Sequence, residues 1–308
     1  MVDMGILFDG FLMFTAILLA GSLSGYLSER VGIVNIGIDG MMCIGALFFG
    51  IYSSPMLGMS DLGFGMLIFP IFLTMISTTL MGALHAFATI KLKANHIISG
   101  TAINMMGLSF ATFLNSALAN SLYNGATKLQ SGFVSFDYLG NGIYLSSIIL
   151  FSIILIIAGC IYIFMRYTKI GLRYNAIGEN PNAVDAQGIN VIKYQWIGVL
   201  LSSAMAGLAG ALFLFNAGQF AGNTAGLGFL ALAIMVAGGW KIEWITLISI
   251  CFALFTSLSS TNILTNMGVP KEIAFSLPYA ITIVVLIAFS KRNMAPAHDG
   301  IPFDKTKR

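Results

Sequence analysis

The sequence predicts an all-α, polytopic transmembrane helical bundle of about eight to ten spans, since about 20 apolar residues cross a bilayer as a helix. Of the 308 residues, 57% are hydrophobic and only 9% are charged, whereas soluble domains are typically about 45–50% apolar and about 25% charged. The apolar residues also lie in long continuous runs, while a closed barrel would show short alternating segments. We therefore expect an integral membrane protein with one domain over residues 1–308.

Nine apolar runs are candidate spans, and helices are expected because backbone polar groups cannot remain unpaired in lipid. The seventh run has only about 15 residues and is rich in glycine, which favours a short broken or re-entrant helix over a full span. The runs cover residues 5–27, 33–52, 66–90, 97–119, 143–165, 195–216, 225–240, 243–264 and 274–290.

Lysine and arginine residues predict the orientation of these spans. If successive runs alternate in direction, thirteen basic residues fall on one side of the membrane and two on the other. Cytoplasmic loops carry an excess of basic residues, so the larger set indicates the cytoplasm. The carboxyl terminus is then expected inside, and the amino terminus outside if there are nine spans. The larger set is Arg30, Lys91, Lys93, Arg166, Lys169, Arg173, Lys193, Lys241, Lys291, Arg292, Lys305, Lys307 and Arg308, and the smaller is Lys128 and Lys271.

A cytoplasmic loop at about 167–193 contains GENPNAVDAQGIN, which has the signals of a short helix. Asn180 is a preferred N-cap residue, Pro181 suits the first helical position, and Gly188 suits the residue after the last turn. A helix over Pro181–Gln187 is marginal alone in water, so it must pack on its own protein or on a partner. An ordinary loop and a docking surface for a soluble subunit both remain open. The exposed side would present Asn182, Asp185 and Gln187.

Two polar residues lie in or beside the second apolar run, in the segment SERVGIVNIGIDGMMCIGALFFG. Asn35 and Asp39 are four residues apart and would share one face of a helix. Polar groups at such positions are costly in lipid, and they usually face a bundle interior or an aqueous path. We expect a pathway or structural role for Asp39, with an acid at the membrane interface as the alternative. Glu29 and Arg30 could form an ion pair at the cytoplasmic edge.

Four amide side chains form a further set of candidate pathway residues. Amides donate and accept hydrogen bonds, so they suit sugar hydroxyls and the edges of heterocycles. They suit hydrogen bonds between helices equally well, and for any single residue that alternative is favoured. The four are Asn104, Asn115, Asn216 and Gln219.

Motifs for nucleotide and metal chemistry are absent from the sequence. It contains no GxxxxGK[ST] phosphate-binding loop, no HExxH, and no cluster of His and Cys with metal-ligand spacing. We therefore expect no ATP hydrolysis, no cofactor and no metal site in this chain.

Several blocks resemble the permease subunits of bacterial ABC importers for nucleosides and simple sugars, the superfamily of branched-chain amino acid and ribose permeases. The blocks are ERVGIVNIGIDGMM, GENPNAVDAQGINVIKYQWIGVLLSSAMAGLAGALF, GLGFLALAIMVAGGW and LPYAITIVVLIAFSKRNMAPAHDGIPF. Together they cover nearly the whole chain, and they are most similar to the shorter permease subunit of guanosine-type nucleoside uptake systems. One departure lies at Trp240–Trp244, where relatives usually have a proline and this chain has none.

The resemblance implies that the chain is a transport subunit for nucleosides in the bacterial plasma membrane and is not itself an enzyme. It implies a cytoplasmic ABC ATPase that holds ATP and Mg²⁺, a second permease subunit in a heterodimer, and an extracytoplasmic substrate-binding lipoprotein. No nucleic acid polymer is implied as a partner. The predicted short helix would be the coupling helix that contacts the ATPase. Its residues would be Asn180, Pro181, Ala183, Val184, Asp185, Ala186 and Gly188.

Other functions remain open on the residues alone. A simple-sugar permease of the ribose or galactose type would carry the same motifs. A secondary transporter would use Asp9, Glu29 or Asp39 as a proton or cation site. An intramembrane serine protease is suggested only by GSLSG at residues 21–25, and no histidine is placed opposite it.

Overall fold

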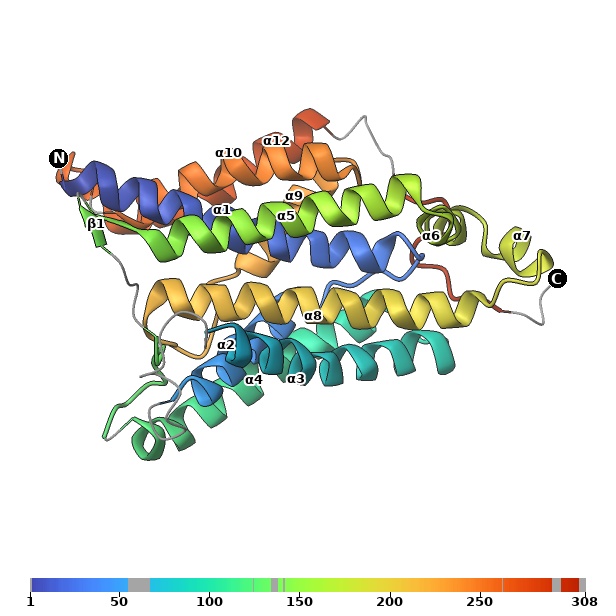
Figure 1. Ribbon diagram of the computed structural model, residues 1–308, viewed down its shortest axis with the longest axis horizontal. Coiled ribbons are helices and arrows are strands. Elements are labelled where there is room, and N and C mark those ends of the chain that lie inside the picture. Colours follow the sequence, from blue (N-terminus) through green and yellow to red (C-terminus); the bar gives the residue numbers. More distant parts are fainter. Residues whose placement is uncertain are drawn as a thin grey trace.

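The computed structural model describes residues 2–54, 67–123, 125–133, 138–140, 142–261, 263–289 and 295–304. Long helices run side by side along one axis, and a small hairpin of two strands lies at the end that holds the amino terminus (Figure 1). The strands are β1 (Tyr138–Gly140) and β2 (Ile143–Tyr144), and they pair antiparallel. The predicted all-α membrane bundle is confirmed.

Six helices in the described ranges are long and apolar enough to cross a membrane. Their bounds agree with the predicted runs to within a few residues, because a continuous apolar run of this length has few other ways to satisfy its backbone in lipid. A seventh long helix, α12 (Lys271–Phe289), corresponds to the last predicted run. The six are α1 (Val2–Glu29), α3 (Ile68–Ala86) with its π-helical extension η4 (Phe87–Lys91), α4 (His96–Leu122), α5 (Leu145–Tyr167), α8 (Val191–Ala217) and α10 (Ile242–Ser260).

Two apolar helices are too short to span a bilayer. Helix α9 (Leu227–Ala237) has 11 residues and α2 (Ile38–Tyr52) has 15, which gives lengths of about 16 and 22 Å against a hydrocarbon core of about 30 Å. The short seventh run was predicted, but the full span predicted over 33–52 is wrong, because the helix begins only at Ile38. The side chain of Asn35 accepts a hydrogen bond from the backbone N–H of Gly37 at 3.0 Å, a local bond that competes with helix formation.

Three further helices lie at the two ends of the bundle. Helices α6 (Lys169–Glu179) and α7 (Pro181–Ala186) lie at the end that also carries the carboxyl terminus (Figure 1). We call this the α6–α7 end. The opposite end carries the amino terminus and the hairpin, and α11 (Ile263–Asn266) joins α10 to α12. Helix α6 was not predicted, since its mixed polar and apolar residues lie outside the long apolar runs.

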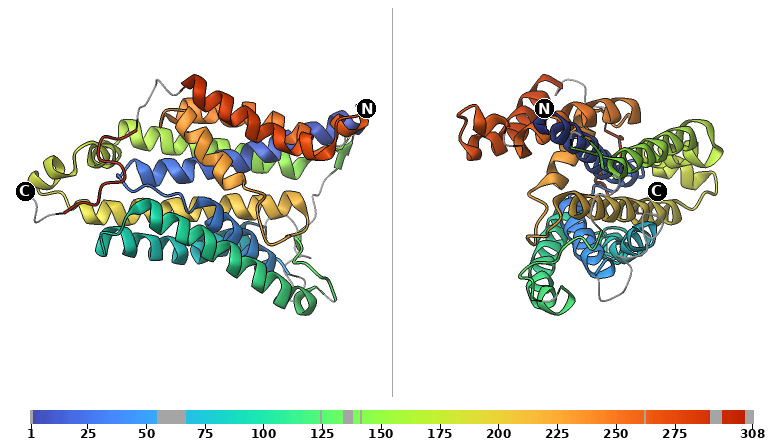
Figure 2. Two further views of the ribbon diagram at one scale, coloured as in Figure 1. Left: turned by 180° about the vertical axis from the view of Figure 1, so that it is seen from behind. Right: turned by 60° about the vertical axis from the view of Figure 1, so that its left-hand side comes forward.

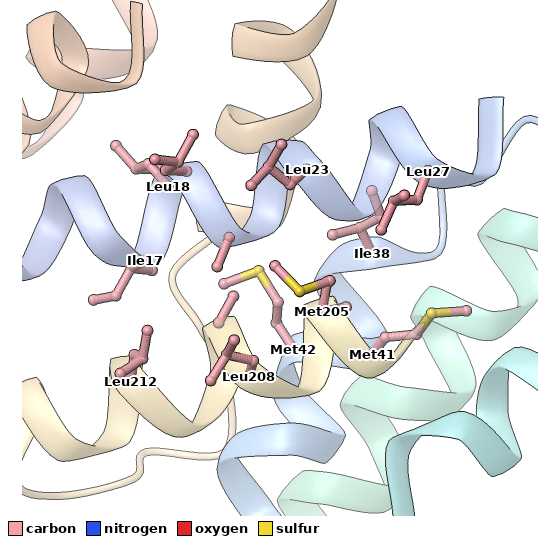
Figure 3. Packing of buried hydrophobic residues seen from close by; sticks show 14 of the residues in the cluster. Ile17, Leu18, Leu23, Leu27, Ile38, Met41, Met42, Met205, Leu208 and Leu212 are labelled. Atoms are coloured by element: carbon pink, nitrogen blue, oxygen red, sulfur yellow. The ribbon is translucent and has the colours of Figure 1, made fainter. Parts of the chain in front are cut away.

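Helices α1 and α8 form the centre of the bundle, and α8 also packs on α2 and α3. Figure 3 shows Ile17 of α1 facing Leu212 of α8, and Met42 of α2 beside Leu208 and Met205 of α8. Small residues of α8 allow a close approach to α2. A Cβ on Gly210 would lie 2.1 Å from the carbonyl oxygen of Met42, so only glycine allows this approach.

The segment 295–304 returns across the α6–α7 end and connects elements that are distant in sequence. The backbone N–H of His298 donates to the carbonyl of Gly178 at 2.9 Å, and that of Gly300 donates to Gly32 at 3.2 Å. Lys93 forms an ion pair with Asp304 at 2.7 Å. The loop after α1, helix α6 and this segment are therefore held together.

Candidate functional site

The short helix α7 forms as its capping residues predict. Asn180 accepts a hydrogen bond from the backbone N–H of Ala183 at 3.1 Å, and Pro181 occupies the first turn. The chain leaves the helix through Gly188, whose φ of +80° lies in the left-handed region that glycine adopts without strain. The helix ends at Ala186, one residue before the predicted end.

The side chains of α7 divide into an inward and an outward set. Pro181 and Val184 are buried against the chain itself, and Val184 is only 6% exposed. Asp185 is half-buried and takes part in an interaction within the chain. The exposed residues of the helix and the turn that follows are Asn182, Ala183, Ala186, Gln187 and Gly188. An outside molecule would therefore meet the second set and not Pro181 or Val184.

Helix α6 anchors α7 to the bundle. The hydroxyl of Tyr174 donates to the carbonyl of Leu27, and the side chain of Gln195 donates to Val31. The first contact fixes α6, and with it α7, to the last turn of α1, while the second fixes the start of α8 to the loop behind α1. A displacement of α7 would therefore be transmitted directly to the central helix of the bundle.

A buried polar cluster closes the same end, and the sequence did not predict it. The indole N–H of Trp240 donates to Glu29 at 2.7 Å, and Arg30 donates to the carbonyl of Trp240. No ion pair between Glu29 and Arg30 occurs in the described ranges, so the predicted pair is not formed. Asp299 contacts Glu29, and burial raises the pKa of Asp299 to about 7. Burial lowers the pKa of His298.

Asp39 lies where the two short helices begin. Its carboxylate belongs to the first turn of α2 and accepts hydrogen bonds from the hydroxyl of Thr224 at 2.8 Å and the backbone N–H of Gly228 at 2.9 Å. Gly228 is in the first turn of α9, so one negative charge faces the positive ends of two helix dipoles. A Cβ on Gly228 would lie 2.3 Å from the Cα of Asp39. We call this meeting point the α2–α9 junction.

Asn35 and Asn104 complete the junction from two other sides. Asn35 is fully buried and donates to the hydroxyl of Ser202 on α8 at 3.0 Å. Asn104 on α4 accepts from the N–H of Gly40 and donates to the carbonyl of Ile36, both at 2.7 Å. The prediction that Asn35 and Asp39 share a helix face is wrong, since Asn35 precedes α2. The structure still brings both to the same region, together with Asn104.

The remaining three amides lie elsewhere. Asn115 is eleven residues beyond Asn104 on α4, or about 16 Å along the helix axis, and it accepts from the backbone N–H of Leu129 at 2.9 Å. Asn216 is half-buried near the end of α8, and Gln219 is exposed and pairs through its backbone with Gln130. Of the three, only Asn115 holds a loop with its side chain, and none contributes to the junction.

Sequence reasoning missed Ser202, Thr224 and Gly228, which are the partners of the junction residues. Ser202 stands in an apolar run, Thr224 directly precedes the short seventh run, and Gly228 lies within it. These positions are the signals that could have drawn attention to the three residues. Within the described residues, no three His, Cys, Asp or Glu side chains are grouped so that they could hold a metal ion.

Comparison with known proteins gives the family. Residues 6–287 match the family described as the permease component of the branched-chain amino acid transport system. The chain belongs to this family. Since the match covers nearly all described helices, the chain is a multi-pass membrane protein and a transport subunit.

Relatives of similar length extend this result. The nucleoside ABC transporter permease protein NupC of Lactococcus lactis is 34% identical, and the guanosine ABC transporter permease protein NupQ of Bacillus subtilis is 33% identical. In both cases the alignment covers 96% of this chain and 96% of the relative. The uncharacterized protein MG121 of Mycoplasma genitalium is 36% identical over the full length of both chains. No solved structure matches.

Proposed function

We propose that this chain is the transmembrane permease subunit of an ATP-driven importer and that it conducts nucleosides. The observation that carries the proposal is the full-length likeness to two permeases named for nucleoside and guanosine transport. The α2–α9 junction supports an uncharged cargo, because Asp39 already neutralises the helix ends that would otherwise attract an anion.

The outward side chains of α7 are the proposed contact with a separate ATPase, which supplies ATP and Mg²⁺. This end of the chain is also rich in basic residues: Arg30 donates to the carbonyl of Trp240, Lys93 pairs with Asp304, Arg166 pairs with Glu243, and Lys241 lies beside Trp240 in the chain. Basic residues favour the cytoplasmic side, so we place α7 and the carboxyl terminus in the cytoplasm of a bacterial plasma membrane. The hairpin end then faces a substrate-binding lipoprotein outside.

Helix α4 supports a second permease chain as a further partner. Only 22% of the residues in its most apolar 18-residue stretch are buried within this chain. Its exposed positions include the hydroxyl residues Thr101, Thr112 and Ser116. Each of these hydroxyls bonds to a carbonyl within this chain, so the support for a partner comes from the large exposed share of the helix. We propose that α4 borders this second chain and the path for the cargo.

Uptake of labelled guanosine by cells that express the complete transporter tests the function. We expect uptake that depends on this chain and on ATP, that competes with other nucleosides, and that does not compete with ribose or galactose. Gentle solubilisation of the tagged chain should bring an ATPase and a second permease with it. Competition by sugars alone would make the chain a sugar permease. Uptake that needs no ATP and collapses with the proton gradient would make it a secondary transporter.

A further inference from the structure

A groove of about 330 Å³ lies outside the candidate site, between α5 and α8. Helix α5 packs on α1, and α8 packs on α1 and α3, while α6 closes the space at the α6–α7 end. Figure 2 shows α5 and α3 on the side of the bundle away from α9, so the groove is separate from the α2–α9 junction. The lining residues are Leu27, Met75, Cys160, Ile161, Phe164, Met165, Ile170, Tyr174, Tyr194, Ile197, Leu201, Ala204 and Met205.

The lining of the groove suits hydrocarbon and little else. It contains no charged side chain, and the hydroxyl of Tyr174 is already used by the carbonyl of Leu27. A sugar or a nucleobase would lose hydrogen bonds to water in this groove without finding replacements, which is unfavourable. Phe164 and Leu201 are partly exposed, at 38% and 46%, so the groove opens sideways to the surroundings of the bundle. In a membrane those surroundings are acyl chains.

The rim of the groove at the α6–α7 end is basic. Four lining residues each have a basic residue as their immediate neighbour in the chain. The pairs are Met165 with Arg166, Ile170 with Lys169, Tyr174 with Arg173, and Tyr194 with Lys193. Arg166 is paired with Glu243 at 3.4 Å on the exposed surface. All four basic side chains are exposed, where they can meet a phosphate at the level of the lipid headgroups.

We propose that this groove binds an acyl chain of an anionic phospholipid from the leaflet at the α6–α7 end, with the phosphate near Lys169, Arg173 and Lys193. Charge complementarity selects an anionic headgroup, and the apolar lining selects the chain beneath it. The lipid would lie directly under α6, which carries α7. A lipid bound in the groove would therefore restrict the motion of α6 and α7, through which we propose that the ATPase acts. The binding itself requires only that the chain spans a membrane.

Photo-crosslinking in vesicles tests the lipid site. The full-length chain is reconstituted in phosphatidylcholine vesicles that contain traces of either phosphatidylglycerol or phosphatidylcholine with a diazirine in the acyl chain. Labelled positions are mapped by mass spectrometry. We expect label concentrated on residues 160–165 and 197–205, with phosphatidylglycerol labelling about fivefold stronger than phosphatidylcholine labelling, as two or three screened charges would produce.

Matched variants separate the groove from its rim. Ala204→Phe fills the groove and should remove the label, whereas Leu80→Phe, at a 67% exposed position on α3, should leave it. The double variant Lys169→Gln and Arg173→Gln should lower the preference for phosphatidylglycerol to near one, while Lys91→Gln should keep it. Equal labelling by both lipids in the unmodified chain, or label spread evenly over the exposed helices, overturns the proposal. Neither result depends on which cargo is carried, so a failed uptake assay leaves this test intact.

Discussion

At the α2–α9 junction the polar side chains meet partners inside the chain, whereas α7 directs half of its side chains outward. Asp39 and Asn104 each make two hydrogen bonds there, to four different residues. Helix α7 is held by Pro181 and Val184, with Asp185 half-buried, and exposes Asn182, Ala183 and Ala186. The stability of the junction therefore depends on close packing and hydrogen bonding within the chain, while the role of α7 depends on the molecule that binds its exposed side. Substitutions should affect abundance at the first region and coupling at the second.

The largest effect is expected from Gly228→Ala. The new Cβ would meet the backbone of Asp39 at 2.3 Å, and overpacking of this kind costs about 3 kcal/mol. We expect a sharp fall in the amount of folded protein, measured by thermal unfolding of the purified chain in detergent. Gly159→Ala on α5 is the control, because nothing lies within 4 Å of its Cβ position. Equal losses in both variants would contradict close packing at the junction.

Two aspartate substitutions in α7 sharpen the contrast within that helix. Val184→Asp places a charge in a buried position and should lower the amount of protein. Ala186→Asp changes an exposed position, so it should leave the amount unchanged and reduce ATP-driven uptake about tenfold, equivalent to ~1.4 kcal/mol of lost coupling. Abundance and uptake are measured in the same membranes. Normal uptake by the Ala186 variant would remove α7 from the contact with the ATPase.

Asp39→Asn tests whether the junction needs a charge or only an acceptor. The amide oxygen of asparagine can still accept from Thr224 and Gly228, so the protein should remain abundant. Without the negative charge the two helix ends are no longer neutralised, and uptake per assembled complex should fall several-fold. Asp39→Ala removes the oxygen that accepts both hydrogen bonds and should lower abundance as well. Unchanged uptake in the asparagine variant means that Asp39 serves only to hold α9.

The smallest effect is expected from pH at the α6–α7 end. Burial raises the pKa of Asp299 from 3.8 to about 7, so the folded state favours the protonated acid. This contribution to stability is complete below about pH 4 and is lost as the pH rises through about 7. Burial lowers the pKa of His298, which acts in the opposite direction, so the contribution of Asp299 is measured against Asp299→Asn. Between pH 5 and pH 8 the unfolding temperature of the unmodified chain should fall by a few degrees relative to that of this variant. Glu179→Gln, at an exposed carboxyl of α6 that accepts from the N–H of Ala297, should behave like the unmodified chain.

The sequence predicted α7 well because its signals are local. Asn180, Pro181 and Gly188 each act within one turn of the helix, so a single sequence contains the whole argument. The junction depends on contacts that a single sequence does not display. Asp39 meets Thr224 and Gly228 across 185 and 189 positions. The amide residues were selected by residue type alone. Residue type does not tell Asn104, at the junction, from Asn115, which lies farther along the same helix toward the hairpin end.

The start of α2 shows why span prediction failed locally. The length of the apolar run predicted one helix over 33–52. Hydropathy does not reveal a side chain that bonds to the backbone nearby, and Asn35 accepts such a bond from Gly37. The buried cluster of Glu29, Trp240 and Asp299 was missed for a related reason. Its members come from three distant segments, and each looks like an ordinary edge residue when read alone.

The returning segment 295–304 has a consequence for biosynthesis. Its bonds to Gly32 and Gly178 join parts of the chain that leave the ribosome at very different times, and it is made after every described helix. Helices can enter the membrane in order, yet the end that carries α7 is incomplete until this segment arrives. A nascent or truncated chain would present α6 and α7 without these bonds. We therefore expect this end to reach its final structure only in chains whose translation has passed the segment.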